Sequence, residues 1–456
     1  MNKNRTELLE KDPKSLMLKL CTPAILGMIV IGLYSFMDGV FAGQLIGKNA
    51  MAAVSVAYPI TFLNSGISTL IGIGSSSILS RAIGKEDQET VDKIMGNLIC
   101  LVVIFSTIIM ILGIIFTKEI LILTGAQGEI LELAVRYLRI IFIGSIFVNF
   151  AQSANMVMRG EGIMKKAMLF MIIGAILNIL LDPILIIYFG EHGIEGAAIA
   201  TIIAQFIQAA ITMYYFRRKS KNVKFHKIQI EKSLLPEIFS VGLSAMMMQL
   251  MSMIQQTLMY RMASKYGGDN NLILMGATLR IQALSFIPLW GMSQGLQPVV
   301  GTNYGANLFK RVKKCTNTFI LGSTVLAFAF WIPIELFPKQ VLSLMITDAS
   351  VVNEGISNFR IIYSSFPVLG AFIMGVTFFQ SIGSAKNAGM LVFLRQLILF
   401  VPAIILIPSI LGIKAVWLVT PIIDLVVFVI LLYLINKSYK NMDNSISERK
   451  NNYAKI

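Results

Sequence analysis

Long apolar runs separated by short polar segments make up nearly the whole chain. Many of these runs reach about 20 residues, the length that an α-helix needs to cross the hydrocarbon core of a bilayer. Strands of membrane barrels are shorter and alternate in hydrophobicity, so the runs predict helices. We therefore expect an all-α polytopic membrane protein with twelve transmembrane helices, at residues 15–44, 51–82, 93–117, 130–158, 165–188, 194–217, 234–265, 273–303, 314–338, 350–380, 386–408 and 414–437.

Composition supports a membrane protein and changes how the charge is interpreted. The chain has 456 residues, of which 56% are hydrophobic and 14% charged, whereas soluble domains carry roughly 25% charge. A net charge of +15 would suit a nucleic-acid binder, but lysine and arginine also gather in cytoplasmic segments of membrane proteins. With both termini cytoplasmic, the basic run "RRKSKNVKFHK" at 217–227 lies inside the cell. The outer loops then hold few basic residues, namely Lys48, Lys118, Lys265, Lys339 and Lys414.

These features predict a multi-pass protein of the cell membrane that contacts lipid and binds no nucleic acid. The N-terminal residues are polar for too long to form a signal peptide, so we expect a cytoplasmic tail there. The three cysteines have no spacing that predicts a disulfide framework or a metal site. No segment marks a protein partner.

The chain contains an internal duplication. "RII" occurs at 139–141 and again at 360–362, and Gly84 matches Gly305 at the same shift of 221 residues. We therefore predict two pseudo-symmetric six-helix lobes, and an even number of helices makes them parallel repeats. The expected domains are a cytoplasmic tail at 1–14, an N-lobe at 15–218, a basic linker at 219–232, a C-lobe at 233–437 and a second cytoplasmic tail at 438–456.

Two parallel lobes that rock about a central cleft are typical of an alternating-access transporter. An enzyme is not expected, because the chain has no HExxH motif, no Walker sequence and only two histidines.

The stretch "NILLDPILII" at 178–187 places an acid and a proline side by side within an apolar run. A carboxylate inside the membrane is expensive and usually functional, and a proline bends or locally opens a helix. At a shift of 219 residues, Pro183 matches Pro402, whereas Asp182 matches Val401. The bend thus belongs to the fold, and the acid belongs to the N-lobe alone. Asp38, in the first helix, is the second intramembrane acid.

Asn178 precedes Asp182 by one helical turn, so both share a face, and Thr201 on the next helix is within reach. Two interpretations stay open. These residues could form hydrogen bonds that hold helices together, or they could bind a coupling ion. Burial disfavours the charged carboxylate, which would let Asp38 and Asp182 exchange H⁺. Alternatively, Asp38, Asn178 and Asp182 could ligate Na⁺ through oxygen. No other cofactor is expected.

A candidate substrate cleft is rich in methionine, aromatic and amide side chains. Tyr34 and Met37 precede Asp38, and "AMMMQLMSMIQQ" at 245–256 carries Gln249 and Gln256. Such walls repack around different ligands and attract organic cations, although each methionine could equally belong to ordinary core. Gln294 lies on the following helix. The sequence names no substrate and assigns no role to Arg280, Arg395 or Asp424.

At these positions the chain resembles the MATE (multidrug and toxic compound extrusion) family. The segments that carry the resemblance are "PAILGMIVIGLYSFMDGVFAGQLIG" at 23–47, "SILSRAIGK" at 77–85, "NILLDPILI" at 178–186 and "SQGLQPVVGTNYGA" at 293–306. The resemblance implies secondary active efflux of cationic, amphipathic drugs or toxic metabolites by H⁺ or Na⁺ antiport. It implies a cation site of Asp38, Asn178, Asp182 and Thr201, with Tyr137, Gln152 and Asn155 nearby. The alternative on the same architecture is a flippase of lipid-linked or amphipathic precursors.

Overall fold

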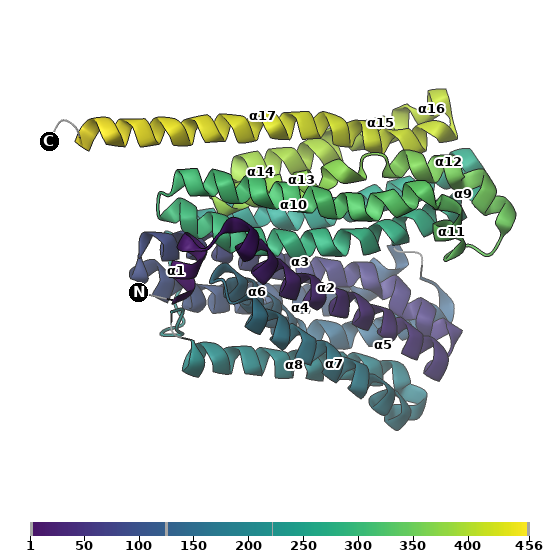
Figure 1. The fold of residues 1–456 in the computed structure, drawn as a ribbon. Coiled ribbons are helices and arrows are strands. Elements are labelled where there is room, and N and C mark those ends of the chain that lie inside the picture. The colour runs from purple at the N-terminus through teal and green to yellow at the C-terminus, as the bar shows by residue number, and fades with distance from the viewer. Residues whose placement is uncertain (1–2, 124–125, 221, 454–456) are drawn as a thin grey trace.

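The computed structural model describes residues 3–123, 126–220 and 222–453. Side chains of residues 3, 34–36, 38–39, 62–63 and 448–453 lie outside this description. Every regular element in the described ranges is a helix, as the apolar runs predict. The helices form two bundles side by side, and both chain termini lie at the same end of the molecule (Figure 1).

The N-lobe contains the helices up to the basic linker. They are α2 (Pro13–Phe41), the π-helix η1 (Ala42–Ile46), α3 (Lys48–Lys85), α4 (Gln88–Leu123), α5 (Gly128–Ile143), α6 (Ser145–Gly160), α7 (Met164–Phe189), η2 (Gly190–His192), α8 (Gly193–Tyr214) and η3 (Tyr215–Lys219). A short helix, α1 (Lys3–Glu10), precedes them. The polar N-terminal segment, expected as a tail, is therefore helical and ordered against the bundle, since Leu8 is buried.

The C-lobe follows the linker. Its helices are α9 (Leu235–Gly305), α10 (Phe309–Leu336), α11 (Pro338–Ser343), α12 (Ala349–Tyr363), α13 (Phe366–Ser381), α14 (Ala385–Phe393), η4 (Leu394–Leu399), α15 (Phe400–Leu406), α16 (Pro408–Leu411) and α17 (Ile413–Tyr453). Helices α3 and α9 pack against each other along the junction of the lobes, and α2 also packs on α9.

Helix α9 joins two of the expected helices through a reversal at a single residue. A straight helix of its 71 residues would be about 105 Å long, several times the thickness of a bilayer core. Gly268 interrupts it with φ 65° and ψ −164°, a conformation that glycine adopts without steric cost. A predicted loop between 265 and 273 thus contracts to a tight turn.

The number of membrane passes stays a prediction. Among the described residues, nine helical segments are long and apolar enough to span a bilayer. Two of them, Met164–Lys219 and Leu235–Gly305, each contain two of the expected passes. The pass expected at 130–158 is divided between α5 and α6 at Gly144, which leaves 16 residues in each part.

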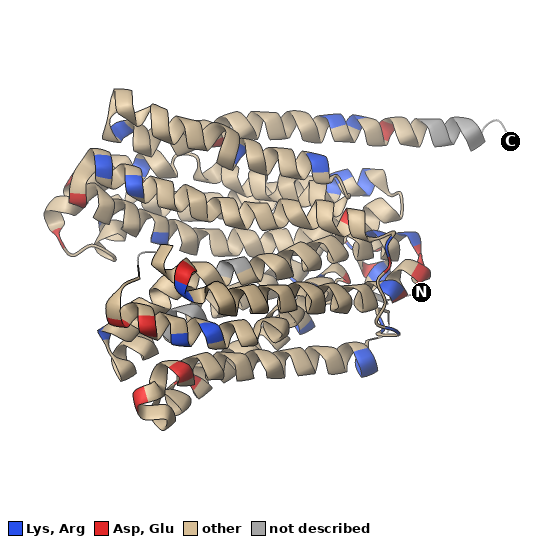
Figure 2. Cartoon of the chain, turned by 180° about the vertical axis from the view of Figure 1, so that it is seen from behind, with Lys and Arg blue, Asp and Glu red and all other residues tan. Residues whose placement is uncertain are grey.

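Charged residues are distributed unevenly along the long axis of the bundle. Lysine, arginine, aspartate and glutamate gather mainly at its two ends, and the middle band is largely free of them (Figure 2). This is the distribution expected for a protein whose middle faces hydrocarbon.

Candidate ion-coupling site and interlobe contacts

Three polar residues predicted to act together meet in the N-lobe core. On α7, the Asn178 amide donates to Asp182 Oδ1 at 3.0 Å. The same amide donates to Thr201 Oγ1 on α8 at 3.2 Å. Asp182 is only 1% exposed and Asn178 only 2%. The hydrogen bonds that the sequence left open are therefore present, and they tie the acid to both helices.

The local sequence of α7 explains why this face points inward. Leu180, Ile184 and Ile187 are all strongly exposed on the outer side, as expected for residues that contact lipid, while the polar face packs on α8. Pro183 lies within α7, and the helix continues through it to Phe189.

One oxygen of this cluster has no hydrogen-bond partner. Asn178 Oδ1 is buried and unpaired, beside the Asp182 carboxylate and the Thr201 hydroxyl. Carboxylate, amide and hydroxyl oxygens suit a hard cation such as Na⁺, and the buried acid alone suits a proton. The part of the chain that the structure describes holds no cluster of three or more His, Cys, Asp or Glu residues that could bind a metal.

Asp38 and Tyr34 lie on α2, but their side chains are outside the described residues. Helix α2 packs against α7, where a Cβ at Gly27 would overlap Met168. Met37 is half-buried. The π-helix η1, directly after α2, contacts both α7 and α8, so the end of the first helix rests on the helices of the coupling cluster.

The three residues expected near the ion site by family resemblance lie on α5 and α6. Tyr137 is 7% exposed and belongs to the same apolar cluster as Ile186 and Ala197. Gln152 accepts a hydrogen bond from Ser68 at 2.7 Å. The Asn155 amide donates to the Ala167 carbonyl at 2.6 Å, so it links α6 to α7.

The predicted cleft glutamines lie at the junction of the lobes or face outward. Thr69 of α3 donates to Gln249 Oε1 of α9 at 3.3 Å. Gln294 Nε2 lies 3.2 Å from the Met28 sulfur on α2. Both therefore contact the N-lobe from the C-lobe, whereas Gln256 is exposed.

The C-lobe contains a buried ion pair that the sequence did not connect. Arg395 Nε donates to Asp424 Oδ1 at 2.7 Å, and Ser365 donates to Asp424 Oδ2 at 2.8 Å. The Arg395 guanidinium also lies over the Phe372 ring, 5.2 Å from its centroid. Arg280, by contrast, is exposed. Asp424 is thus paired within its own lobe.

A second polar cluster in the N-lobe also escaped the sequence analysis. Asn149 Nδ2 donates to Asn64 Oδ1 and to Ser106 Oγ, both at 2.9 Å. Its three members lie on α3, α6 and α4, so no periodic spacing along the chain relates them.

Another pattern, "GMSQG" at 291–295, matches the GxSxG of many hydrolases. It lies inside helix α9, where Ser293 bonds to Thr377 at 2.7 Å. A nucleophile of that kind sits on a strand-to-helix turn, so the match has no catalytic meaning here.

The lobes are closed at the end that carries both termini. A Cβ on Gly84 of α3 would overlap the Thr302 carbonyl of α9, and one on Gly305 would overlap the Arg81 carbonyl. Arg81 also forms an ion pair with Glu237 of α9. Such backbone approach needs glycine and leaves no passage between α3 and α9 at this end.

The family model MatE matches this chain twice, at residues 23–184 and 244–405. The chain belongs to the MatE family. Both ends of the second match lie 221 residues beyond those of the first, which agrees with the shift seen in the sequence. Members of this family are membrane transporters rather than enzymes.

Curated relatives cover most of the chain. It is 24% identical over 412 residues to the multidrug export protein MepA of Staphylococcus aureus (strain MRSA252), covering 89% of this chain and 90% of that protein. It is 25% identical over 334 residues to the probable multidrug resistance protein YoeA of Bacillus subtilis (strain 168), covering 72% of each.

Solved structures share the two-lobe fold. A MOP superfamily transporter from Pyrococcus furiosus superposes with a TM-score of 0.90 at 27% identity, covering 97% of this chain and 99% of that one. A MATE structure in a bent conformation has a TM-score of 0.91 at 27% identity, with 98% and 99% coverage. Others are described as straight and as outward-facing. This range of conformations supports alternating access in the MatE fold.

Proposed function

We propose that this MatE family protein exports small organic cations, drugs or toxic metabolites, from the cell by antiport against H⁺ or Na⁺. The observation that carries the proposal is Asp182, an acid that is 1% exposed and tied to Asn178 and Thr201 inside the N-lobe. A carboxylate buried inside a membrane protein costs free energy, and such residues are usually functional. The relatives MepA and YoeA are named for multidrug export and resistance.

We place both termini in the cytoplasm, with the closed end of the lobes toward the cell interior. The basic segments around 217–227 support this orientation through the positive-inside rule. The described contacts between α3 and α9 then belong to an outward-facing state, in which substrate leaves to the outside.

In this mechanism, a proton or Na⁺ arriving from outside neutralises Asp182 together with Asp38. Neutralisation removes the attraction for a cationic substrate, which then leaves outward, and the lobes close outside and open inside. Where Na⁺ is the ion, the Asp182 carboxylate, the Asn178 carbonyl oxygen and the Thr201 hydroxyl would hold it. One charge that crosses 100 mV contributes about 2.3 kcal/mol, and one pH unit contributes about 1.4 kcal/mol.

The alternative function, a flippase of lipid-linked precursors, gains no support from these relatives, which are described as multidrug proteins.

The test is efflux of a lipophilic fluorescent cation from vesicles that contain the purified protein. A pH gradient and a Na⁺ gradient are imposed separately, and empty vesicles and vesicles treated with an ionophore serve as controls. We expect one gradient to drive export and the ionophore to abolish it. Export that neither gradient accelerates would contradict ion antiport.

A further inference from the structure

The N-terminal helix α1 lies between the two lobes at their closed end. Leu8, on α1, is 2% exposed and belongs to the main apolar core. Its side chain also lies against the turn after α6, where a Cβ on Gly162 would sit 3.1 Å from it. A residue outside the predicted membrane spans is therefore buried in the main apolar core.

On one side, α1 is bound to the N-lobe. Arg5 donates to the carbonyls of Ile83 at 3.0 Å and Gly84 at 3.1 Å, and pairs with Glu86 at 2.7 Å. These carbonyls belong to the last turn of α3, where the regular helical amide partners end, and the Ile83 carbonyl also accepts from the Glu86 amide at 3.3 Å. A cation is favourable at this negative end of a helix dipole.

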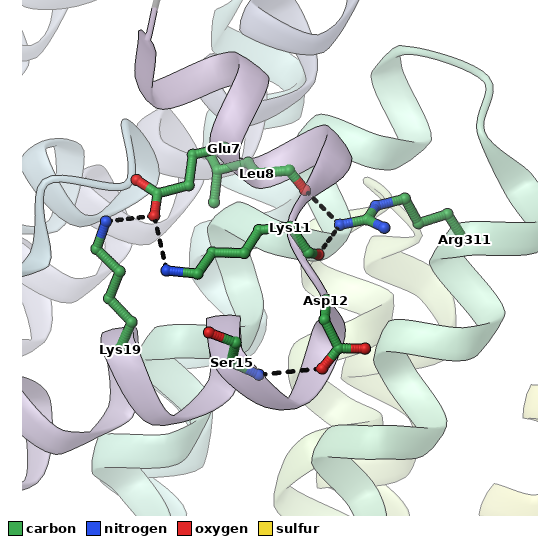
Figure 3. Close-up of polar contacts among 7 residues, drawn as sticks. All are labelled: Glu7, Leu8, Lys11, Asp12, Ser15, Lys19 and Arg311. Atoms are coloured by element: carbon green, nitrogen blue, oxygen red, sulfur yellow. Dashed lines mark hydrogen bonds and ion pairs between the residues drawn. The ribbon is translucent and has the colours of Figure 1, made fainter.

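On the other side, α1 is bound to the C-lobe, and here carbonyls at the end of α1 accept hydrogen bonds from an arginine of the C-lobe. Arg311 of α10 donates to the carbonyls of Leu8 and Lys11 (Figure 3). Asn303 of α9 donates to the Leu8 carbonyl at 3.0 Å. The C-terminal end of α1 thus receives a cation from the C-lobe, while α1 itself supplies one to α3.

Two further interactions fix α1 in this position. Glu7 accepts hydrogen bonds from Lys19 of α2 and from Lys11, and these lysines lower its pKa although burial acts in the opposite direction. Asp12 accepts from the backbone amides of Lys14 at 3.0 Å and Ser15 at 3.3 Å, which caps the start of α2. These contacts fix the short connection between α1 and α2 in place (Figure 3).

We propose that α1 is a clasp that holds the lobes together at the cytoplasmic end and must release before the transporter can open inward. The proposal rests on the alternating-access function above. Because Arg5 binds α3 and Arg311 binds the end of α1, separation of α3 from α10 breaks one of these two contacts. The clasp stabilises the outward-facing state beyond the direct contacts of α3 with α9.

The first test measures the distance between the lobes by pulsed electron paramagnetic resonance. Spin labels are attached at Lys165→Cys and Lys310→Cys, in a chain whose native cysteines are replaced. Both positions are exposed, and they lie on different lobes. With Arg5→Gln and Arg311→Gln combined, we expect the population with a long distance to rise about tenfold or more, as charged hydrogen bonds are lost. Arg218→Gln is the control, because this exposed arginine at the same end has no ion pair among the described residues. An unchanged distance distribution in the double variant would overturn the clasp.

A cross-linking test does not depend on the stability of that variant. A short cleavable thiol cross-linker is applied to Lys11→Cys with Arg311→Cys, which joins the clasp to the C-lobe. The matched control is Arg5→Cys with Glu86→Cys, which joins it only to the N-lobe. We expect the first cross-link to prevent the long-distance state until it is cleaved, and the second to leave that state accessible. Opening despite the first cross-link would overturn the proposal.

The two proposals can fail separately. Distances are measured without any substrate, so a chain that opens as described but does not export the probe cation would count against the proposed function alone.

Discussion

Asn178 and Asp182 lie one helical turn apart on α7, and the amide of the first donates to the carboxylate of the second over 3.0 Å. The same amide reaches Thr201, and its own oxygen is left buried without a partner. An unsatisfied buried oxygen next to an acid is costly in a purely structural contact. Under the proposed function, this oxygen is available to a coupling cation.

Replacement of Asn178 by leucine removes both the donor and the unpaired oxygen. If the ion is Na⁺, we expect the Na⁺ concentration for half-maximal export to rise roughly 10- to 100-fold, in line with a charged hydrogen bond of about 1.5–3 kcal/mol. The ion dependence of efflux measures this. Asn358→Leu, the same change at a half-buried C-lobe position, should leave the value unchanged. An unaltered ion dependence in Asn178→Leu would exclude the residue from the site.

A methyl group at Gly84 should force the closed end apart. The added Cβ would overlap backbone atoms of Thr302 and Ala306, and neither can move without shifting α9. We expect Gly84→Ala to lengthen the distance between the labels at Lys165→Cys and Lys310→Cys and to slow export. Gly389→Ala is the control, because nothing lies within 4 Å of a Cβ there. Wild-type distances in Gly84→Ala would show that α3 and α9 do not seal this end.

The buried pair of Arg395 and Asp424 should behave as one unit. Their side chains are 12% and 1% exposed, so removal of either charge leaves the other buried and uncompensated, at a cost of about 3–5 kcal/mol. We expect Arg395→Met and Asp424→Asn each to lower the stability of the protein strongly. The double variant should lose much less than the sum of the two. Thermal unfolding in detergent measures this, and additive losses would argue against a coupled pair.

Glu161, just beyond the end of α6, predicts a pH dependence of stability. Burial raises the pKa of this carboxyl group to about 7, although Asn222 and Lys166 act in the opposite direction. Between about pH 4.5 and pH 7, the folded chain therefore keeps a proton on Glu161 that the unfolded chain releases. The free energy of unfolding should fall as pH rises from about 4.5 to about 7.

Glu161→Gln removes this titration while keeping the shape of the side chain. Between about pH 5 and pH 8, the wild type should lose up to roughly 3 kcal/mol relative to the variant. Chemical unfolding at a series of pH values tests this, with Glu132→Gln as an exposed control. Parallel curves for the wild type and Glu161→Gln would mean that Glu161 is ionised in the fold throughout.

The sequence predicted the elements and contacts that depend on local periodicity. Apolar runs located the helices, and the spacing of Asn178 and Asp182 placed both on one face of α7. Thr201 was within reach because α7 and α8 are consecutive and antiparallel. These inferences need only the pitch of a helix and a short connection.

Contacts between distant segments could not be predicted in the same way. Arg395 and Asp424 lie on helices separated by a reversal at Gly412, and no periodic pattern relates them. The clasp depends on backbone carbonyls of Leu8 and Ile83, which carry no sequence signal because every residue has one. The reversal of α9 depends on the positive φ of Gly268 within "YGGDNN", where a longer loop was the natural expectation.

The most direct test of the coupling mechanism is gradient-driven efflux by Asp182→Asn. Vesicles that contain the wild type, Asp182→Asn or Asp92→Asn are compared at equal protein content under the gradient that drives the wild type. Asp92→Asn makes the same chemical change at a partly exposed position. We predict that Asp182→Asn binds the fluorescent cation more weakly and no longer couples its export to the gradient, while Asp92→Asn exports normally. Full gradient-driven export by Asp182→Asn would contradict the account.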